Sequence, residues 1–161
     1  MKIKMLVMDV DGTLTDGKIY MSNSGEIMKA FDVKDGYGIC KILPQEGIIP
    51  VIITGRQSLI VRNRASELGI EQIFQGVNNK EECLSYVCAE NRLDYNEIAY
   101  IGDDDNDLTC MKKCGMVGCP CDASDNVKII ADFISEYSGG RGAVRDFIYY
   151  IVKRNIEVKD E

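Results

Sequence analysis

The feature that most constrains the fold is a regular alternation of short apolar runs with longer amphipathic stretches along the chain. The apolar runs have the length of buried strands, and the stretches between them have helical periodicity. Such alternation is typical of a parallel sheet with helices on both faces, so we predict a single domain with a doubly wound, Rossmann-like α/β fold. The predicted strands are Ile3–Met8, Ile49–Ile53, Ile73–Phe74, Ile98–Ile101 and Met116–Val117, and the predicted helices are Gly36–Glu46, Ser58–Leu68, Lys80–Asn91, Asp105–Lys113, Ser124–Ala131 and Gly140–Arg154.

The segment Lys18–Phe31 departs from this alternation and is typical of a β-hairpin, with Ser22–Gly25 as its turn. An apolar ribbon of this kind normally marks an interface between subunits. The alternative is a hairpin folded back on its own core, because isolated ribbons are only marginally stable. The apolar side chains of its two strands are Ile19, Tyr20, Met21, Ile27, Met28 and Phe31.

Charge and composition narrow the range of partners. Acids outnumber bases by 26 to 19, for a net charge of −7, so nucleic acids and anionic membranes are poor partners. The apolar start is too short for a signal peptide, and no run approaches the length of a membrane span. The chain has no histidine, so acid–base chemistry near neutral pH must use carboxylates, lysine, cysteine or tyrosine.

The seven cysteines, an odd number, argue against a disulfide framework and favour the reducing cytoplasm. The densest group is Cys114, Cys119 and Cys121, which raises the question of a metal site. Without histidine or a paired Cys-x-x-Cys, small buried residues are the favoured interpretation.

Polar side chains follow four of the predicted strands. Because the carboxyl ends of parallel strands meet at one edge of a sheet, we expect these groups to share one site. Asp11 lies two residues after Asp9, and residues two apart on an extended segment point the same way. The groups are Asp9 after the first strand, Thr54 after the second, Lys80 after the third, and Asp103 and Asp104 after the fourth.

Clustered carboxylates repel one another, and a divalent cation would cancel that repulsion. Magnesium prefers oxygen ligands, so the pattern predicts a Mg²⁺ site. Each element alone has a plainer interpretation: a solvated turn at Asp9–Asp11, a helix start at Gly102–Asp107, a loop at Thr54–Arg56 and a surface lysine at Lys80. Their joint occurrence, each at a predicted strand end, favours the site.

These segments, "DVDGTLTDG", "ITGR", Lys80 and "GDDDND", resemble the four motifs of the haloacid dehalogenase superfamily of phosphatases. Nearly the whole chain is similar to its small capless branch, the 3-deoxy-D-manno-octulosonate 8-phosphate phosphatase type. The segments that carry this likeness are "LTDGKIY", "GEIMKAFDVKDGYGI", "ITGRQSLIVRNRASELGI", "FQGVNNK" and "GGRGAVRDF".

The resemblance implies that Asp9 is the nucleophile, which forms an aspartyl-phosphate intermediate. Asp11 is then the general acid for the leaving sugar oxygen and the base for the hydrolytic water. Magnesium is expected to bind the side chains of Asp9 and Asp103 and the backbone carbonyl of Asp11. Thr13 differs from the valine common in this branch, and we expect that to matter little.

The other motif residues are expected to support the phosphoryl group. Thr54 and the Gly55 backbone would hydrogen-bond a phosphoryl oxygen, and Lys80 would neutralise charge and pair with Asp9. Asp107 would support Lys80 or a metal-bound water. For Asp104 two interpretations stay open, a supporting ligand or a helix-start acid.

The resemblance also implies contacts to the sugar acid or its phosphate. A guanidinium group suits a 2-keto-acid carboxylate, although Arg64 could also lie on a solvated helix face. Arg56 favours an eight-carbon over a nine-carbon acid, because phosphatases for the latter tend to carry an acidic residue there. Arg141 and Arg145 belong either to a tail that reaches a neighbouring site or to a plain helix start. The residues that match the substrate contacts are Asp32, Val33, Lys34, Asp35, Gly36, Arg56 and Arg64.

The implied protein is a magnesium-dependent phosphatase of a phosphorylated sugar acid, 3-deoxy-D-manno-octulosonate 8-phosphate being favoured, and a homotetramer joined by its hairpins. The alternatives are a nonulosonic acid 9-phosphate phosphatase, a broad housekeeping phosphatase, and a non-catalytic module like those fused to some cytidylyltransferases. Such modules typically lose motif residues. The motif residues are all present here, which favours an enzyme.

Overall fold

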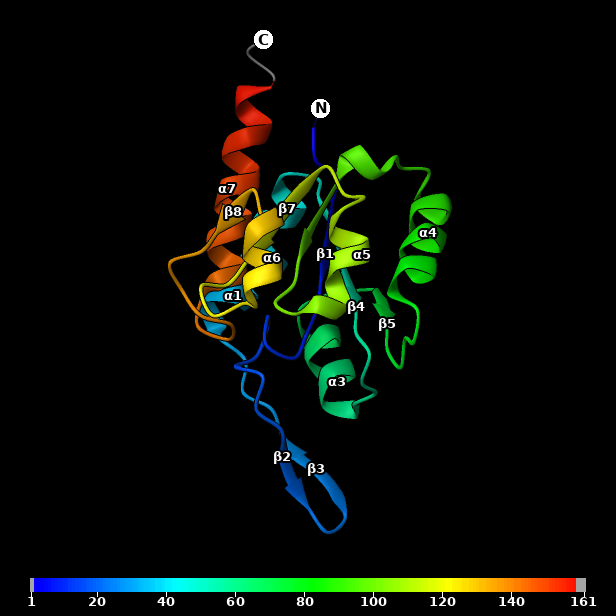
Figure 1. The fold of residues 1–161 in the computed structure, drawn as a ribbon, viewed down its shortest axis with the longest axis vertical. Helices are drawn as coiled ribbons and strands as arrows, with labels where there is room; N and C mark the ends of the chain where they lie inside the picture. Colours follow the sequence, from blue (N-terminus) through cyan, green and yellow to red (C-terminus); the bar gives the residue numbers. More distant parts are fainter. Residues whose placement is uncertain (1, 159–161) are drawn as a thin grey trace.

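The computed structural model describes residues 2–158, and its main element is a six-stranded parallel sheet in the order β5-β4-β1-β6-β7-β8 (Figure 1). Strand β1 is central and fully buried, and it pairs with β4 on one side and β6 on the other. The predicted doubly wound α/β class is confirmed. The strands are β1 Met5–Met8, β4 Ile49–Ile53, β5 Gln72–Phe74, β6 Ile98–Ile101, β7 Met116–Cys119 and β8 Phe133–Ile134.

Helices cover both faces of the sheet, so each face has its own apolar core. One core contains Val61 of α3 and Phe147 of α7, and the other contains Leu84 of α4 and Val127 of α6. A sheet buried on both faces explains why its strands are continuous apolar runs. The first face carries α1 (Val33–Tyr37), α3 (Leu59–Glu67) and α7 (Ala143–Glu157); the second carries α4 (Lys80–Asn91), α5 (Leu108–Met111) and α6 (Asp125–Ile130).

Two of the predicted helices are divided in the structure. The single helix predicted at Gly36–Glu46 is divided into α1, a π-helical turn η1 (Gly38–Ile42) and a short α2 (Leu43–Gln45). Pro44 lies at the start of α2, where its missing N–H is tolerated. The helix predicted at Asp105–Lys113 is a 3₁₀ turn, η3 (Asp105–Asp107), followed by α5, and a second 3₁₀ turn, η2 (Tyr95–Glu97), precedes β6. Strand β8 was not predicted, because two residues are too few to show a period.

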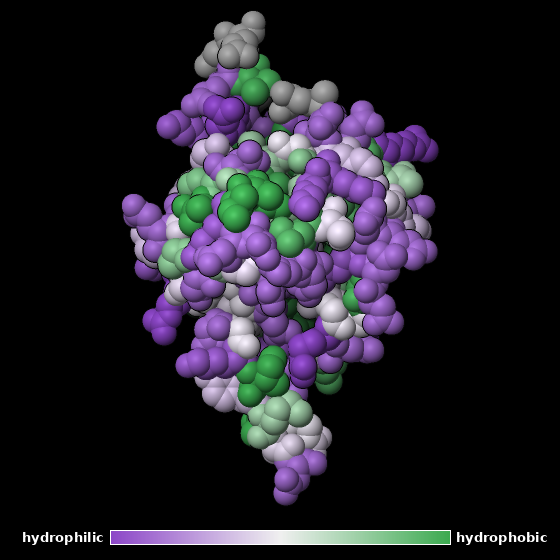
Figure 2. Space-filling model, in the orientation of Figure 1, coloured by the Kyte–Doolittle hydropathy of each residue, from purple (hydrophilic) through white to green (hydrophobic). Residues whose placement is uncertain are grey.

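The predicted hairpin is present, formed by β2 (Tyr20–Ser22) and β3 (Gly25–Met28), and it projects from the body on the side away from both termini (Figure 1). Met21 and Ile27 are 57% and 58% exposed. Figure 2 shows apolar side chains along the hairpin and a hydrophilic tip. The alternative that its strands fold back on the core is therefore wrong, although Phe31, beyond β3, does pack against that core.

The remaining sequence expectations concern the cysteines and the membrane. All seven cysteines are unpaired; Cys110 and Cys119 are buried, whereas Cys121 is exposed. Across residues 2–158, the group of side chains close enough to hold a metal ion consists of carboxylates and includes no cysteine. No helix in that range is long and apolar enough to cross a membrane.

Candidate active site

The carboxyl ends of β1, β4 and β6 form a cleft of about 330 Å³. Asp9 follows β1 directly, Thr54 follows β4 directly, and Asp103 lies just beyond β6. The sheet topology thus brings together side chains that are far apart in sequence, as the strand-end pattern predicts. The polar lining comprises Asp9, Asp11, Thr54, Gly55, Arg56, Asp103, Asp104 and Asn106.

Lys80 joins two aspartates at the base of this cleft. It is the first residue of α4, where the side chain of Asn79 caps the helix. Its Nζ donates to Asp9 Oδ1 and to Asp107 Oδ1, at 2.8 Å each, and the lysine side chain is only 5% exposed. Burial disfavours the charged amine, but the two carboxylates outweigh this effect and raise the pKa of Lys80. Lys80 is therefore a fixed buried cation beside Asp9.

Asp107 has most of its hydrogen-bonding capacity satisfied by protein groups. Besides Lys80, the Tyr100 hydroxyl donates to Oδ1 at 2.8 Å, and the Asp103 N–H donates to Oδ2 at 3.3 Å. Of the two supports predicted for Asp107, the structure has the contact to Lys80. Tyr100 was missed by the sequence analysis, because a tyrosine within a buried strand gives no signal of its partner.

Asp9, Asp103 and Asp107 place carboxylate oxygens within 4.8 Å of one another. Burial, and then the charge of Asp107, raise the pKa of Asp9 to about 6. Burial, and then the charge of Asp9, raise the pKa of Asp103 to about 8. Because Asp107 is already occupied by Lys80 and Tyr100, Asp9 and Asp103 are the side chains left for a cation. This set of crowded oxygen donors fits Mg²⁺.

The loop after β1 holds Asp103 in place. Thr13 Oγ1 donates to Asp103 Oδ1 at 3.0 Å, so Thr13 has a contact that the sequence analysis did not anticipate. Gly12 has a φ of +89°, and a Cβ there would lie 2.0 Å from Asp103 Oδ2. The Val10 carbonyl accepts from the N–H groups of Thr13 and Leu14, so the chain turns at Asp11. The argument from an extended segment was therefore wrong, although Asp9 and Asp11 do line the same cleft.

Asp11 is contacted by two cations at the mouth of the cleft. Lys29, immediately after β3, places Nζ 2.5 Å from Asp11 Oδ1, and Arg56 Nε lies 3.9 Å from Oδ2. Burial opposes the charge on Lys29, but the hydrogen bond to Asp11 and the ion pair with Glu26 raise the pKa of Lys29. Lys29 was not predicted as a site residue, because nothing in the hairpin sequence shows which side chain turns toward the body.

Comparison with known proteins agrees with this geometry. A family profile described as haloacid dehalogenase-like hydrolase matches residues 72–148. The chain is 42% identical, over 144 residues, to the 3-deoxy-D-manno-octulosonate 8-phosphate phosphatase of Escherichia coli K12. The matched region covers 89% of this chain and 76% of that relative. The chain belongs to the haloacid dehalogenase-like hydrolases. The predicted superfamily is confirmed.

Solved structures of similar haloacid dehalogenase-like hydrolases share the whole fold. One is the 3-deoxy-D-manno-octulosonate 8-phosphate phosphatase of Yersinia pestis, with a TM-score of 0.91, 38% identity, and coverage of 98% of this chain and 84% of that one. Another is the Moraxella catarrhalis enzyme in complex with magnesium ion, phosphate ion and KDO, with a TM-score of 0.90, 39% identity, and coverage of 97% and 90%. A cobalt-bound form from Haemophilus influenzae has a TM-score of 0.91 at 36% identity, covering 96% and 90%.

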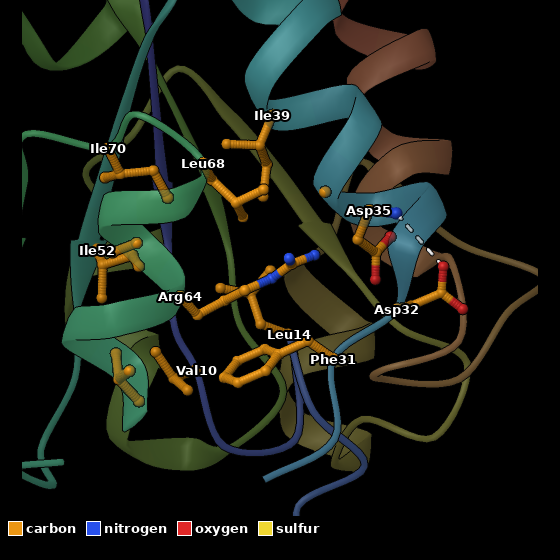
Figure 3. A pocket seen from close by; sticks show the side chains of 13 residues that line it. Val10, Leu14, Phe31, Asp32, Asp35, Ile39, Ile52, Arg64, Leu68 and Ile70 are labelled. Atoms are coloured by element: carbon orange, nitrogen blue, oxygen red, sulfur yellow. Dashed lines mark hydrogen bonds between the residues drawn. The ribbon is translucent and has the colours of Figure 1, made fainter. Parts of the chain in front are cut away.

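In this haloacid dehalogenase-like hydrolase, the residues predicted to contact substrate do not lie together within one chain. Arg56 lines the cleft, whereas Asp32, Asp35, Gly36 and Arg64 line a separate space between α1 and α3 (Figure 3). That space is about 10 Å³, which holds at most one water and no sugar. Figure 3 shows Arg64 extending from α3 toward α1, beside the Phe31 ring; it also pairs with Glu67 at 2.7 Å.

Asp35 and Arg145 contact each other across α1 and α7. Asp35 Oδ1 accepts from the Arg145 N–H at 2.8 Å, and burial raises the pKa of Asp35 to about 6. The Arg145 guanidinium lies between the rings of Tyr37 and Tyr149, 4.8 and 4.7 Å from their centroids. Within one chain these residues join two helices and do not enter the cleft.

The remaining members of the predicted set are placed as follows. Asp104 accepts from the Asp105 N–H at 2.8 Å and caps η3, as expected of a helix-start acid; it also lines the cleft, so the supporting ligand stays a prediction. Asp32 likewise caps α1, accepting from the Lys34 N–H at 2.7 Å. Val33 is 78% exposed and has its side chain in solvent. Arg141 lies in the loop before α7, beside a surface cavity that Lys34 and Arg145 also line.

Proposed function

We propose that the chain is a magnesium-dependent phosphatase that hydrolyses 3-deoxy-D-manno-octulosonate 8-phosphate through an aspartyl-phosphate intermediate. The observation that carries the proposal is the buried Asp9–Lys80 pair beside Asp103, at the edge of the sheet where Asp11 and Arg56 complete the cleft. The relatives support it, because their names state this activity and the structure of one relative holds magnesium, phosphate and KDO.

Asp9 and Asp11 divide the chemistry between them. The Asp9 carboxylate attacks phosphorus, the bond between phosphorus and the ester oxygen breaks, and a proton from Asp11 passes to the leaving oxygen. In the second half, water attacks phosphorus, Asp11 takes its proton, and the bond to Asp9 breaks. The two steps release the sugar alcohol and inorganic phosphate, and both aspartates return to their initial states.

The other cleft residues orient the phosphoryl group. Lys80 holds Asp9 by one oxygen and brings a positive charge that is hardly exposed to water. Thr54 is buried, and its backbone is held by the N–H of Val77 at 3.1 Å, so Thr54 and Gly55 present fixed groups to the phosphate. A magnesium ion bound by the side chains of Asp9 and Asp103 and the backbone carbonyl of Asp11 would neutralise phosphoryl charge.

Substrate choice rests on the residues at the rim and on assembly. The Arg56 side chain is half exposed, so its guanidinium is free to pair with a sugar-acid carboxylate. In the part of the chain described, no cap domain covers the cleft. We propose that the apolar hairpins assemble four subunits and that neighbouring subunits close the site, where Asp32–Gly36 and Arg64 take their predicted contacts. The seven unpaired cysteines support a location in the reducing cytoplasm.

The test is a panel of phosphorylated sugar acids with eight and nine carbons, with hexose phosphates as controls. Phosphate release is measured with Mg²⁺ and again with a chelator. We expect the highest kcat/KM on the eight-carbon acid and no turnover with chelator. A preference for a nine-carbon acid would show that the proposed eight-carbon substrate is wrong, and equal rates on every ester would indicate a broad phosphatase. If no ester released phosphate, the chain would be a non-catalytic module.

A further inference from the structure

The base of the hairpin is bound to the catalytic cleft of its own chain through Lys29. The Lys29 side chain is 1% exposed, and its Nζ lies 2.5 Å from Asp11 Oδ1 and 2.9 Å from Glu26 Oε1. A buried ammonium is costly unless carboxylates compensate for its lost hydration; Glu26 does so here, and Asp11 does so once it has given up its proton. Lys29 is therefore held on both sides, by the loop after β1 and by β3.

The contact continues from Glu26 to the body of the protein. Ser58 Oγ donates to Glu26 Oε2 at 2.5 Å, and Ser58 also caps α3 by accepting from the Val61 N–H. The Ser58 N–H in turn donates to Gln75 Oε1 at 2.9 Å. These bonds connect Asp11 through Lys29 and Glu26 to the start of α3, so the ammonium has little freedom to move.

The position of the ammonium matters for the charge on Asp11. The contact occupies Oδ1, whereas Oδ2 lies on the side of Arg56, at the cleft. As Asp11 gives its proton to the leaving oxygen, negative charge develops on its carboxyl group. A fixed cation 2.5 Å away stabilises that charge, and the single occupied oxygen restricts rotation of the carboxyl group.

We propose that Lys29 is a positioning residue for Asp11, which orients the carboxyl group and stabilises the charge that develops on it during leaving-group protonation. The inference rests on the proposed function of Asp11 and adds the hairpin to the catalytic machinery of its own chain. It predicts that loss of Lys29 lowers kcat/KM more for an ester with a basic leaving group, which needs protonation, than for one with a weakly basic leaving group.

The experiment compares phenyl phosphate with p-nitrophenyl phosphate, because phenol is the more basic leaving group. For Lys29→Met we expect kcat/KM to fall on the order of tenfold or more on phenyl phosphate and less than about threefold on p-nitrophenyl phosphate. The matched control is Lys41→Met, an exposed lysine in η1, for which we expect both values unchanged. Neither substrate is a sugar acid, so the result does not depend on which natural ester is hydrolysed.

Two outcomes would overturn the proposal: equal losses on both esters, or no loss on either, in a variant with wild-type circular dichroism and thermal midpoint. If Lys29→Met does not fold, Lys29→Gln decides, since it keeps a polar N–H group at this position without the charge. A selective loss on phenyl phosphate supports the proposal in either variant. Failure of the proposed function has a different signature, because Asp11→Asn would then leave both esters unaffected.

Discussion

At the scale of single residues, the catalytic cleft depends on a few polar side chains in an apolar interior. Asp9, Lys80 and Asp107 are each nearly or fully buried and are joined by short hydrogen bonds. Sequence analysis could place the residues that follow strands, because a strand end has a recognisable pattern. It could not find Tyr100 or Lys29, whose roles depend on which side chain meets which in three dimensions.

The most direct prediction at this scale concerns replacement of Asp9, the proposed nucleophile. Asp9→Asn should lower kcat by at least about 10³-fold, because an amide cannot form the phosphoenzyme, while the fold is kept. The control is Asp105→Asn, in the acidic motif after β6; Asp105 bonds to Ser124 and Asn126 outside the cleft and should tolerate the change. Substantial turnover by Asp9→Asn in a phosphate-release assay would contradict the assignment.

Metal binding should depend on pH because the pKa values of Asp9 and Asp103, the two proposed side-chain ligands, are raised. Without metal, Asp103 has a pKa of about 8 against an ordinary 3.8, so its protonated form stabilises the fold below about pH 4, and that contribution is lost as the pH rises toward 8. Magnesium binds the ionised form and competes with protons. The rise in thermal midpoint on adding Mg²⁺ should therefore be larger at pH 8 than at pH 6.

That comparison is made by thermal unfolding with Mg²⁺ and with chelator at both values of pH. In Asp103→Asn the response to Mg²⁺ should be much weaker at either pH, because one of the two proposed side-chain ligands is gone. A larger response at pH 6 than at pH 8 in the unmodified chain would show that other groups bind the ion.

At the scale of elements, turns and caps decide where the structure departs from the sequence pattern. The sequence analysis placed α3 and α4 to within one residue at each end, and each helix begins with a capping side chain, Ser58 and Asn79. It merged α1, η1 and α2 into one helix, because a π-helical turn has no sequence signature that a periodic pattern detects. Arg64 was predicted either to contact the substrate or to lie on a solvated helix face; within one chain it pairs with Glu67, a neighbour one helical turn away.

The contact between Asp35 and the start of α7 gives a prediction for stability. Asp35→Ala should destabilise the protein by about 1–3 kcal/mol, because the partly buried Arg145 N–H loses its acceptor. Asp35→Asn keeps a carbonyl oxygen at that position and should lose much less. Thermal unfolding of the two variants at one pH makes the comparison; equal losses would mean that the hydrogen bond contributes nothing.

At the scale of the whole molecule, the order of strands explains how distant segments form one cleft. Strand β1 lies between β4 and β6, so Asp9, Thr54 and Asp103 are placed side by side by the sheet itself. The sequence predicted this because each strand is a distinct apolar run. It could not predict how the hairpin is oriented, because that depends on the buried contact between Lys29 and Asp11.

Assembly through the hairpin is testable by its apolar strands. We expect the unmodified chain to have four times its 18.0 kDa mass in solution, and Ile27→Glu to reduce this mass, because a charge would be buried in the contact. Ser24→Glu, in the exposed turn, is the matched control and should keep the mass. Light scattering after gel filtration measures it. A monomer in the unmodified chain, or an unchanged mass in Ile27→Glu, would rule out this interface.

The packing of Gly139 against the loop after β1 has a consequence for biosynthesis. A Cβ at Gly139 would lie 1.9 Å from the Gly12 carbonyl oxygen, so these two backbone segments touch directly. Ribosomes synthesise Asp9 before Asp103 and Gly139 after both. A nascent chain that already contains Asp9 and Asp103 therefore still lacks the backbone that supports the loop after β1, and it should acquire phosphatase activity only when residues near Gly139 have emerged from the exit tunnel.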